Sequence, residues 1–95
     1  MSEISINEMR SALNDILEGS PVYQEDVSQK TDEQLLNTNL QLEYELDSLD
    51  FEELLQVINS YYNIEVDEED MWDSSFYQEP TVRNFIKLCH DRGHY

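Results

Sequence analysis

Ser48 is the residue whose setting could support covalent chemistry, because carboxylates stand close on both sides of it in the run Asp47-Ser48-Leu49-Asp50. An apolar stripe with helical spacing begins directly afterwards, so the run falls at the start of a helix. A side chain in that position is well placed to stay in solvent. No base that could activate the hydroxyl stands nearby in the sequence. The pattern therefore favours a serine that another enzyme modifies over one that attacks a substrate itself.

A catalytic role and a helix-capping role are the alternatives for Ser48. A catalytic serine needs a base, usually a histidine, and an oxyanion hole. His90 and His94 lie far along the chain, and no Gly-x-Ser-x-Gly turn is present, so a serine hydrolase is disfavoured. The simpler alternative is that Asp47 or Ser48 only caps a helix, since both residue types are preferred there. Propensity alone leaves this alternative open.

The charge of the chain is strongly one-sided, with 22 acidic and 5 basic residues and a net charge of −17. Fifteen Asp and Glu, and no Lys or Arg, lie between Thr31 and Val82. Such a field argues against binding nucleic acid or anionic membranes and favours partners that present Lys/Arg patches. On charge alone, a solvated surface that only keeps the protein soluble is an equally good interpretation.

Other polar clusters do not favour a site, and no metal is expected. Cys89 is the only cysteine and cannot form an intramolecular disulfide. Cys89-His90 with His94 fits a C-terminal tail better than a metal site, and the acidic run 67–70 lacks the alternating ligands and glycine of a calcium loop. Without a signal-peptide pattern or an apolar run of membrane length, we expect a cytoplasmic protein with no membrane insertion.

Hydrophobic periodicity predicts an all-α fold, and the length fits one domain over residues 1–95. The first helix is expected from about Ser5 to Glu18, with a capping box formed by Ser5 and Glu8. The second helix, over residues 47–63, is the clearest, because six apolar or aromatic residues make a continuous stripe along it. They are Phe51, Leu54, Leu55, Ile58, Tyr61 and Tyr62.

The remaining segments are predicted from weaker signals. Residues 20–46 read as a long, mostly polar connection that packs down and holds a short helical turn near residues 31–36. A short third helix is expected over residues 67–72, followed by a loop over 74–79. The last helix begins after Thr81, which suits an N-cap, and ends near Gly93.

The signature and its surroundings resemble the acyl carrier protein family, which includes the peptidyl and other phosphopantetheine-bearing carriers. The Asp-Ser-Leu at 47–49 matches the signature of that family, and the Asp at 50 is a common next residue. Glu-Leu at 53–54, Ile-Glu-Val at 64–66 and Thr-Val at 81–82 then resemble the family pattern in order and without a gap. The resemblance covers nearly the whole chain.

This resemblance implies a four-helix bundle with a long first loop and a short third helix, and a protein that is not itself an enzyme. It implies that Ser48 carries a covalent 4'-phosphopantetheine from coenzyme A, on which acyl groups travel as thioesters. The implied partners are a phosphopantetheinyl transferase and acyl-transferring, condensing or ligase enzymes with basic docking patches. Asp47, Leu49, Asp50 and Glu53 are expected to contact them. The expected protein is a stand-alone monomeric carrier for fatty-acid, polyketide or related biosynthesis.

Two features depart from the family pattern. Glu45 stands where the family often has a glycine, so the backbone before Ser48 lacks the freedom of glycine at positive φ. The stretch from Met71 to Glu79 is rich in aromatic residues, namely Trp72, Phe76 and Tyr77. We expect these to complete a small core, and a cavity for an acyl chain is the alternative.

Three rival functions remain open. One is an acidic interaction protein without a prosthetic group, such as a nucleic-acid mimic or an inhibitor of a basic enzyme, in which Ser48 would only cap its helix. Another is a degenerate carrier that keeps the fold but is no longer modified. The last is a peptidyl or D-alanyl carrier, which shares the same signature.

Overall fold

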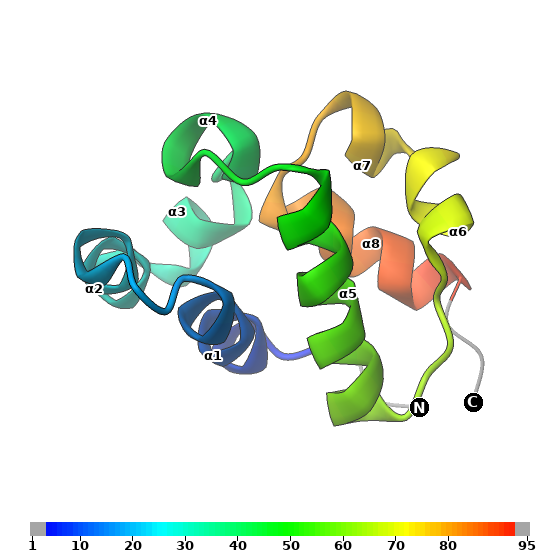
Figure 1. Ribbon diagram of the computed structural model, residues 1–95, viewed down its shortest axis with the longest axis horizontal. Helices are drawn as coiled ribbons and strands as arrows, with labels where there is room; N and C mark the ends of the chain where they lie inside the picture. The colour runs from blue at the N-terminus through cyan, green and yellow to red at the C-terminus, as the bar shows by residue number, and fades with distance from the viewer. Residues whose placement is uncertain (1–3, 93–95) are drawn as a thin grey trace.

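Helices make up the fold of the described part of the chain, residues 4–92, in the computed structural model (Figure 1). The only strand-like pairing within this range is an isolated antiparallel bridge between Asn39 and Thr81. The helices are α1 (Ile6–Ile16), α2 (Pro21–Gln29), α3 (Asp32–Leu36), α4 (Leu40–Tyr44), α5 (Ser48–Tyr62), α6 (Glu68–Trp72), α7 (Ser75–Gln78) and α8 (Val82–Arg92). The predicted all-α class is confirmed.

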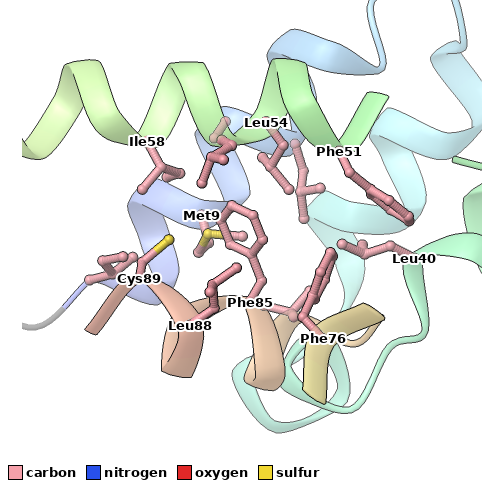
Figure 2. Close-up of a cluster of buried hydrophobic side chains, with 14 of the residues drawn as sticks. Met9, Leu40, Phe51, Leu54, Ile58, Phe76, Phe85, Leu88 and Cys89 are labelled. Carbon is pink, nitrogen blue, oxygen red and sulfur yellow. The ribbon is translucent and has the colours of Figure 1, made fainter. Parts of the chain in front are cut away.

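Helix α5 lies at the centre of the structure and packs against α1 (Figure 1). Its apolar stripe is buried at Phe51, Leu54, Leu55 and Ile58, as the spacing predicts. Helix α8 places Phe85 against the same core, as Figure 2 shows. Because α5 is held by burial along one face, its opposite face stays free to meet other molecules.

Both ends of α5 match the prediction for residues 47–63. Asp47 is the N-cap, and Asn63 ends the helix in the left-handed conformation with φ of 52°. Asparagine tolerates this conformation better than most residues. The short third helix is confirmed as α6, and the last helix as α8, where the Thr81 hydroxyl accepts a hydrogen bond from the Asn84 amide at 3.2 Å. Gly93, the predicted end of that helix, lies outside the described residues.

The connection over residues 20–46 contains more helix than predicted. The turn near 31–36 is confirmed as α3, but α2 and α4 occupy stretches that the sequence did not identify as helical. Pro21 lies in the first turn of α2, where proline is tolerated because its missing N–H has no partner to lose. Val27 is the only buried residue of α2, so its apolar stripe is too sparse to be recognised.

Two smaller predictions were wrong. Residues 74–79 are not all loop, because α7 forms there around the buried Phe76. Ser5 does cap α1 by accepting a hydrogen bond from the Asn7 amide, but it does not form the predicted capping box with Glu8. The Ser5 amide instead donates to the Tyr62 hydroxyl at 2.8 Å, which joins the start of α1 to the end of α5.

Polar contacts hold the 20–46 segment against the rest of the fold. The Arg10 guanidinium on α1 donates to the carbonyls of Val27 and Lys30, each at 2.7 Å, and pairs with Asp32 at 2.6 Å. These bonds satisfy carbonyl groups at the end of α2, where no helical partner is available. The segment is therefore tied to α1 at its middle.

The Tyr44 hydroxyl makes a second tie, from α4 to α2, by donating to the Asp26 carboxylate at 2.8 Å. This hydrogen bond is the main cause that lowers the pKa of Asp26. Burial, and then the contact with Asp26, raise the pKa of Tyr44. Tyr44 is the last residue of α4, and residues 45–47 connect it to Ser48 at the start of α5. The tie therefore helps to position this connection.

We predict that Tyr44→Phe lowers the free energy of unfolding at neutral pH by about 1 kcal/mol, the usual net value of one hydrogen bond. The folded-state pKa of Asp26 is depressed, so this contribution is present above the usual carboxyl pKa and is lost as pH falls through the folded-state value. The difference between wild type and variant should therefore shrink as pH falls well below the usual carboxyl pKa. Urea unfolding at neutral and at acid pH measures the difference.

Tyr77→Phe serves as the control, because no hydrogen bond of the Tyr77 hydroxyl occurs within residues 4–92. It should leave the free energy of unfolding unchanged at either pH. An equal loss in both variants, or a Tyr44→Phe loss that persists in acid, would contradict the role given to the Asp26 contact.

Candidate functional site

Ser48 is the first residue of α5 and is exposed to solvent. Its hydroxyl has no hydrogen-bond partner among the residues that the structure describes. The start of α5 lies between α4 and α7 (Figure 1). A free hydroxyl at an open helix end can be reached by another protein.

A reciprocal pair of hydrogen bonds sets the start of α5. The Asp47 carboxylate accepts from the Asp50 amide, and the Asp50 carboxylate accepts from the Asp47 amide, each at 3.1 Å. This is a capping box, with Asp at the third helical position in place of the more usual Glu or Gln. It fixes Asp47 as the N-cap and Ser48 as the first residue of α5.

The capping box leaves part of the helix N-terminus unsatisfied. Asp47 takes up the amide of Asp50, whereas the amides of Ser48 and Leu49 make no hydrogen bond within the described range. Unpaired N–H groups and the helix dipole make such an end attractive to a phosphate group. The carboxylates of Asp47 and Asp50 oppose this attraction.

The other predicted contact residues lie on the surface next to Ser48. The Leu49 side chain is 70% exposed, although it is apolar. Glu53 is also exposed and lies one turn further along α5 on the same face as Leu49. An apolar side chain beside Ser48, with carboxylates around it, forms a surface of mixed character.

No ion pair neutralises this surface within the described residues. Four of the five cations pair with acids elsewhere, namely Arg10 with Asp32, Lys30 with Asp26, Arg83 with Glu33 and Arg92 with Asp70. Further along α5, a hydrogen bond with Glu68 raises the pKa of Glu52, as expected where carboxyl groups crowd together. The Ser48 end of α5 therefore presents uncompensated negative charge.

The backbone just before this end is unusual. Glu45 ends α4 in the left-handed conformation, with φ of 56° and ψ of 33°. Its carboxylate accepts a hydrogen bond from the Tyr23 hydroxyl at 2.9 Å. The family that the sequence resembles often has glycine at this position, and the backbone here does adopt the conformation that glycine favours. Glutamate adopts it at a cost of roughly 1–2 kcal/mol.

A groove of about 750 Å³ opens directly beside Ser48. Helices α4, α5, α6 and α7 and the residue before Thr81 contribute to its lining. The lining residues are Gln41, Asp47, Ser48, Phe51, Trp72, Phe76, Tyr77 and Pro80. In the aromatic-rich stretch, Phe76 is buried in the core as expected, while Trp72 and Tyr77 form an open wall of the groove.

Among the described residues, the lining of the groove contains no histidine, lysine or cysteine. His90 is exposed on α8 beside Asp91, and burial raises the pKa of the Cys89 thiol to about 12. Within residues 4–92, no cluster of three or more His, Cys, Asp or Glu is arranged to hold a metal ion. No helix of that range is both long and apolar enough to cross a membrane.

The structure brings Ser48, Asp47, Leu49, Asp50 and Glu53 together at one end of α5, as their spacing requires. A cavity here was expected only as the alternative to a core role for residues 71–79, because the walls of the groove come from segments up to about forty residues apart in sequence. The aromatic richness of residues 71–79 was the one available signal. The reciprocal partner of Asp47 was also missed, because Asp50 was interpreted as a family match and a partner contact and not as part of a capping box.

One comparison with known proteins is informative. A family model described as a phosphopantetheine attachment site matches residues 25–89. The match begins within α2, includes all of α5 and ends within α8. No curated protein and no solved structure gives a significant match.

The conformation of Glu45 yields a prediction on stability. Glu45→Gly should be more stable than Glu45→Ala by about 1 kcal/mol, because both remove the contact with Tyr23 but only glycine adopts positive φ without strain. Chemical denaturation of the two variants measures the difference.

The matched control is Glu43, which lies inside α4. There Glu43→Gly should be less stable than Glu43→Ala, by about 0.5–1 kcal/mol, since glycine is unfavourable within a helix. If alanine is better than glycine at both positions, Glu45 does not have the left-handed conformation described.

Proposed function

Because this chain belongs to the family of phosphopantetheine attachment domains, we propose that it is a carrier protein that holds acyl groups as thioesters on an arm attached to Ser48. Proteins of this family bear 4'-phosphopantetheine covalently on a serine. The observation that carries the assignment to Ser48 is its place in an Asp-Ser-Leu signature at the exposed start of α5, inside the matched range. When attached, the arm supplies the thiol that this end of the protein lacks.

The residues around Ser48 fit such a group. The hydroxyl is exposed and unpartnered in the described structure, so a transferase can reach it. The free amides of Ser48 and Leu49 can donate to a phosphodiester oxygen at the helix N-terminus. The groove next to Ser48 offers an apolar surface beside the point of attachment. In the attachment, the Ser48 oxygen bonds to the phosphorus that carries pantetheine, and the pyrophosphate bond of coenzyme A breaks. Adenosine 3',5'-bisphosphate leaves, and the serine proton passes to a base supplied by the transferase.

The surface around Ser48 supports the second part of the proposal, which concerns partners. Exposed Leu49, with the carboxylates of Asp47, Asp50 and Glu53 around it, fits enzymes that combine an apolar socket with a basic rim. These are a phosphopantetheinyl transferase and enzymes of fatty-acid, polyketide or related biosynthesis. Exposed charges at the edge of an interface mainly raise the rate of association, which suits a carrier that must also leave each partner. The chemistry at the thioester belongs to those partners.

The direct test is the mass of the intact protein after incubation with coenzyme A and a broad-specificity phosphopantetheinyl transferase. We expect the wild type to gain one phosphopantetheine and Ser48→Ala to gain none. Ser60→Ala is the matched control, because Ser60 is an exposed serine further along the same helix, and it should be modified like the wild type. If the folded wild type gains no mass with several transferases, the protein is a degenerate carrier or an acidic binding protein.

The docking role of Glu53 can be tested separately. Glu53→Gln should lower the kcat/KM of arm attachment by about 2- to 5-fold, the range that corresponds to one exposed ion pair. Glu65→Gln removes the same charge beyond the far end of α5 and should have little effect. The effect of Glu53→Gln should fade as salt rises, because exposed charges are screened. Equal effects of the two substitutions would indicate that only net charge matters.

A further inference from the structure

The groove beside Ser48 has a floor that cannot easily be opened. Phe51 and Phe76 line the groove and are almost fully buried. Their rings meet edge to face at 5.1 Å between centroids, and Phe76 meets Phe85 in the same way at 5.3 Å. Figure 2 shows these rings in one buried cluster with Leu54, Ile58 and Met9. A long flexible chain could enter the interior only by displacing this cluster, which is costly in a close-packed core.

The wall of the groove is different, because it is aromatic and open. Trp72 is half-buried, and Tyr77 is 61% exposed. The two rings meet edge to face, with centroids 5.1 Å apart and planes at 88°. An aromatic guest could add to this pair in the offset or edge-to-face arrangements that aromatic rings prefer. A flat, rigid group also loses little conformational freedom on a shallow surface, whereas a flexible alkyl chain loses more.

Ser48 itself lines the groove, so a group carried on an arm at Ser48 would lie close to the aromatic wall. A group on an arm attached to Ser48 is tethered at the edge of the groove, so its effective concentration there is high without any strong intrinsic affinity. A shallow site that would not retain a free ligand can therefore hold a tethered one.

We propose that this groove binds a flat, aromatic acyl group carried on the protein's own arm, and that Trp72 and Tyr77 are the residues that favour such a cargo over an alkyl chain. The proposal rests on the proposed attachment of the arm to Ser48. It assigns the class of cargo, which the signature shared by all carriers does not distinguish.

The test compares a phenyl cargo with a cyclohexyl cargo of the same carbon skeleton, with a linear alkyl cargo and with a short reference cargo. The protein is loaded with arms bearing 3-phenylpropionyl, 3-cyclohexylpropionyl, octanoyl or acetyl groups, and loading is verified by intact mass. The midpoint of thermal unfolding is then measured for each form relative to the acetyl form. A bound-to-free ratio of about 5 for the phenyl cargo should raise the midpoint by about 4–8 °C, and the cyclohexyl and octanoyl cargoes should raise it less.

Substitutions of the groove residues and nuclear Overhauser contacts show where the cargo binds. Trp72→Leu and Tyr77→Leu should each abolish most of the phenyl-specific rise, when every variant is compared with its own acetyl form. Tyr61→Leu is the control, because Tyr61 is an exposed tyrosine near the other end of α5 and should keep the rise. Trp72 is the only tryptophan, so nuclear Overhauser contacts from the cargo to its single indole N–H can be assigned without ambiguity.

Several results would overturn the inference. An equal or larger rise with octanoyl, together with contacts to Leu54 or Ile58, would mean that alkyl chains enter the core. A rise that survives in Trp72→Leu and Tyr77→Leu would place the cargo elsewhere, and no rise with any cargo would mean that the groove does not hold it. Absence of loading in the mass spectrum would contradict the proposed function itself, and the inference would fall with it.

Discussion

The reciprocal hydrogen bonds between Asp47 and Asp50 are the interaction on which the site depends. They decide at which residue α5 begins, and so they place Ser48 in its first turn with an exposed hydroxyl. A helix that began one turn later would leave Ser48 in a loop, and one that began a turn earlier would place Ser48 inside the helix, where its amide would be taken up by a helical hydrogen bond. The cap also satisfies the Asp50 amide while leaving those of Ser48 and Leu49 available.

The rest of the fold holds this end of α5 in place at some cost. The left-handed turn at Glu45 bends the chain out of α4 into the residues before Ser48, and the Tyr44 bond to Asp26 holds α4 against α2. Acidic side chains crowd along α5, where a hydrogen bond with Glu68 raises the pKa of Glu52. Such strain and repulsion are typical of functional surfaces, where the geometry needed for partners differs from the geometry that would maximise stability.

The sequence predicts this site better than it predicts the surrounding fold. The α5 stripe and its Asp47 cap are local patterns, so both the helix and the position of Ser48 can be predicted from them. Helix α2 could not be predicted from such a pattern because Val27 is its only buried residue. Helix α7 could not be predicted because four residues are too few to show a helical period. The groove depends on the packing of α6 and α7 against the start of α5, which no local pattern encodes. At position 45 the sequence places glutamate where the family often has glycine, which predicts that positive φ would be unfavourable there. The structure nevertheless has Glu45 in the left-handed conformation.

The measurement that tests the account most directly is to map the modification on protein that has been loaded from coenzyme A. Cleavage after glutamate isolates residues 46–52, in which Ser48 is the only hydroxyl-bearing residue, whereas trypsin leaves residues 31–83 as one piece. We predict that the mass of one phosphopantetheine is found on the 46–52 fragment alone. An unmodified 46–52 fragment, or the same mass on any other fragment, would contradict the claim that Ser48 is the attachment site of a carrier protein.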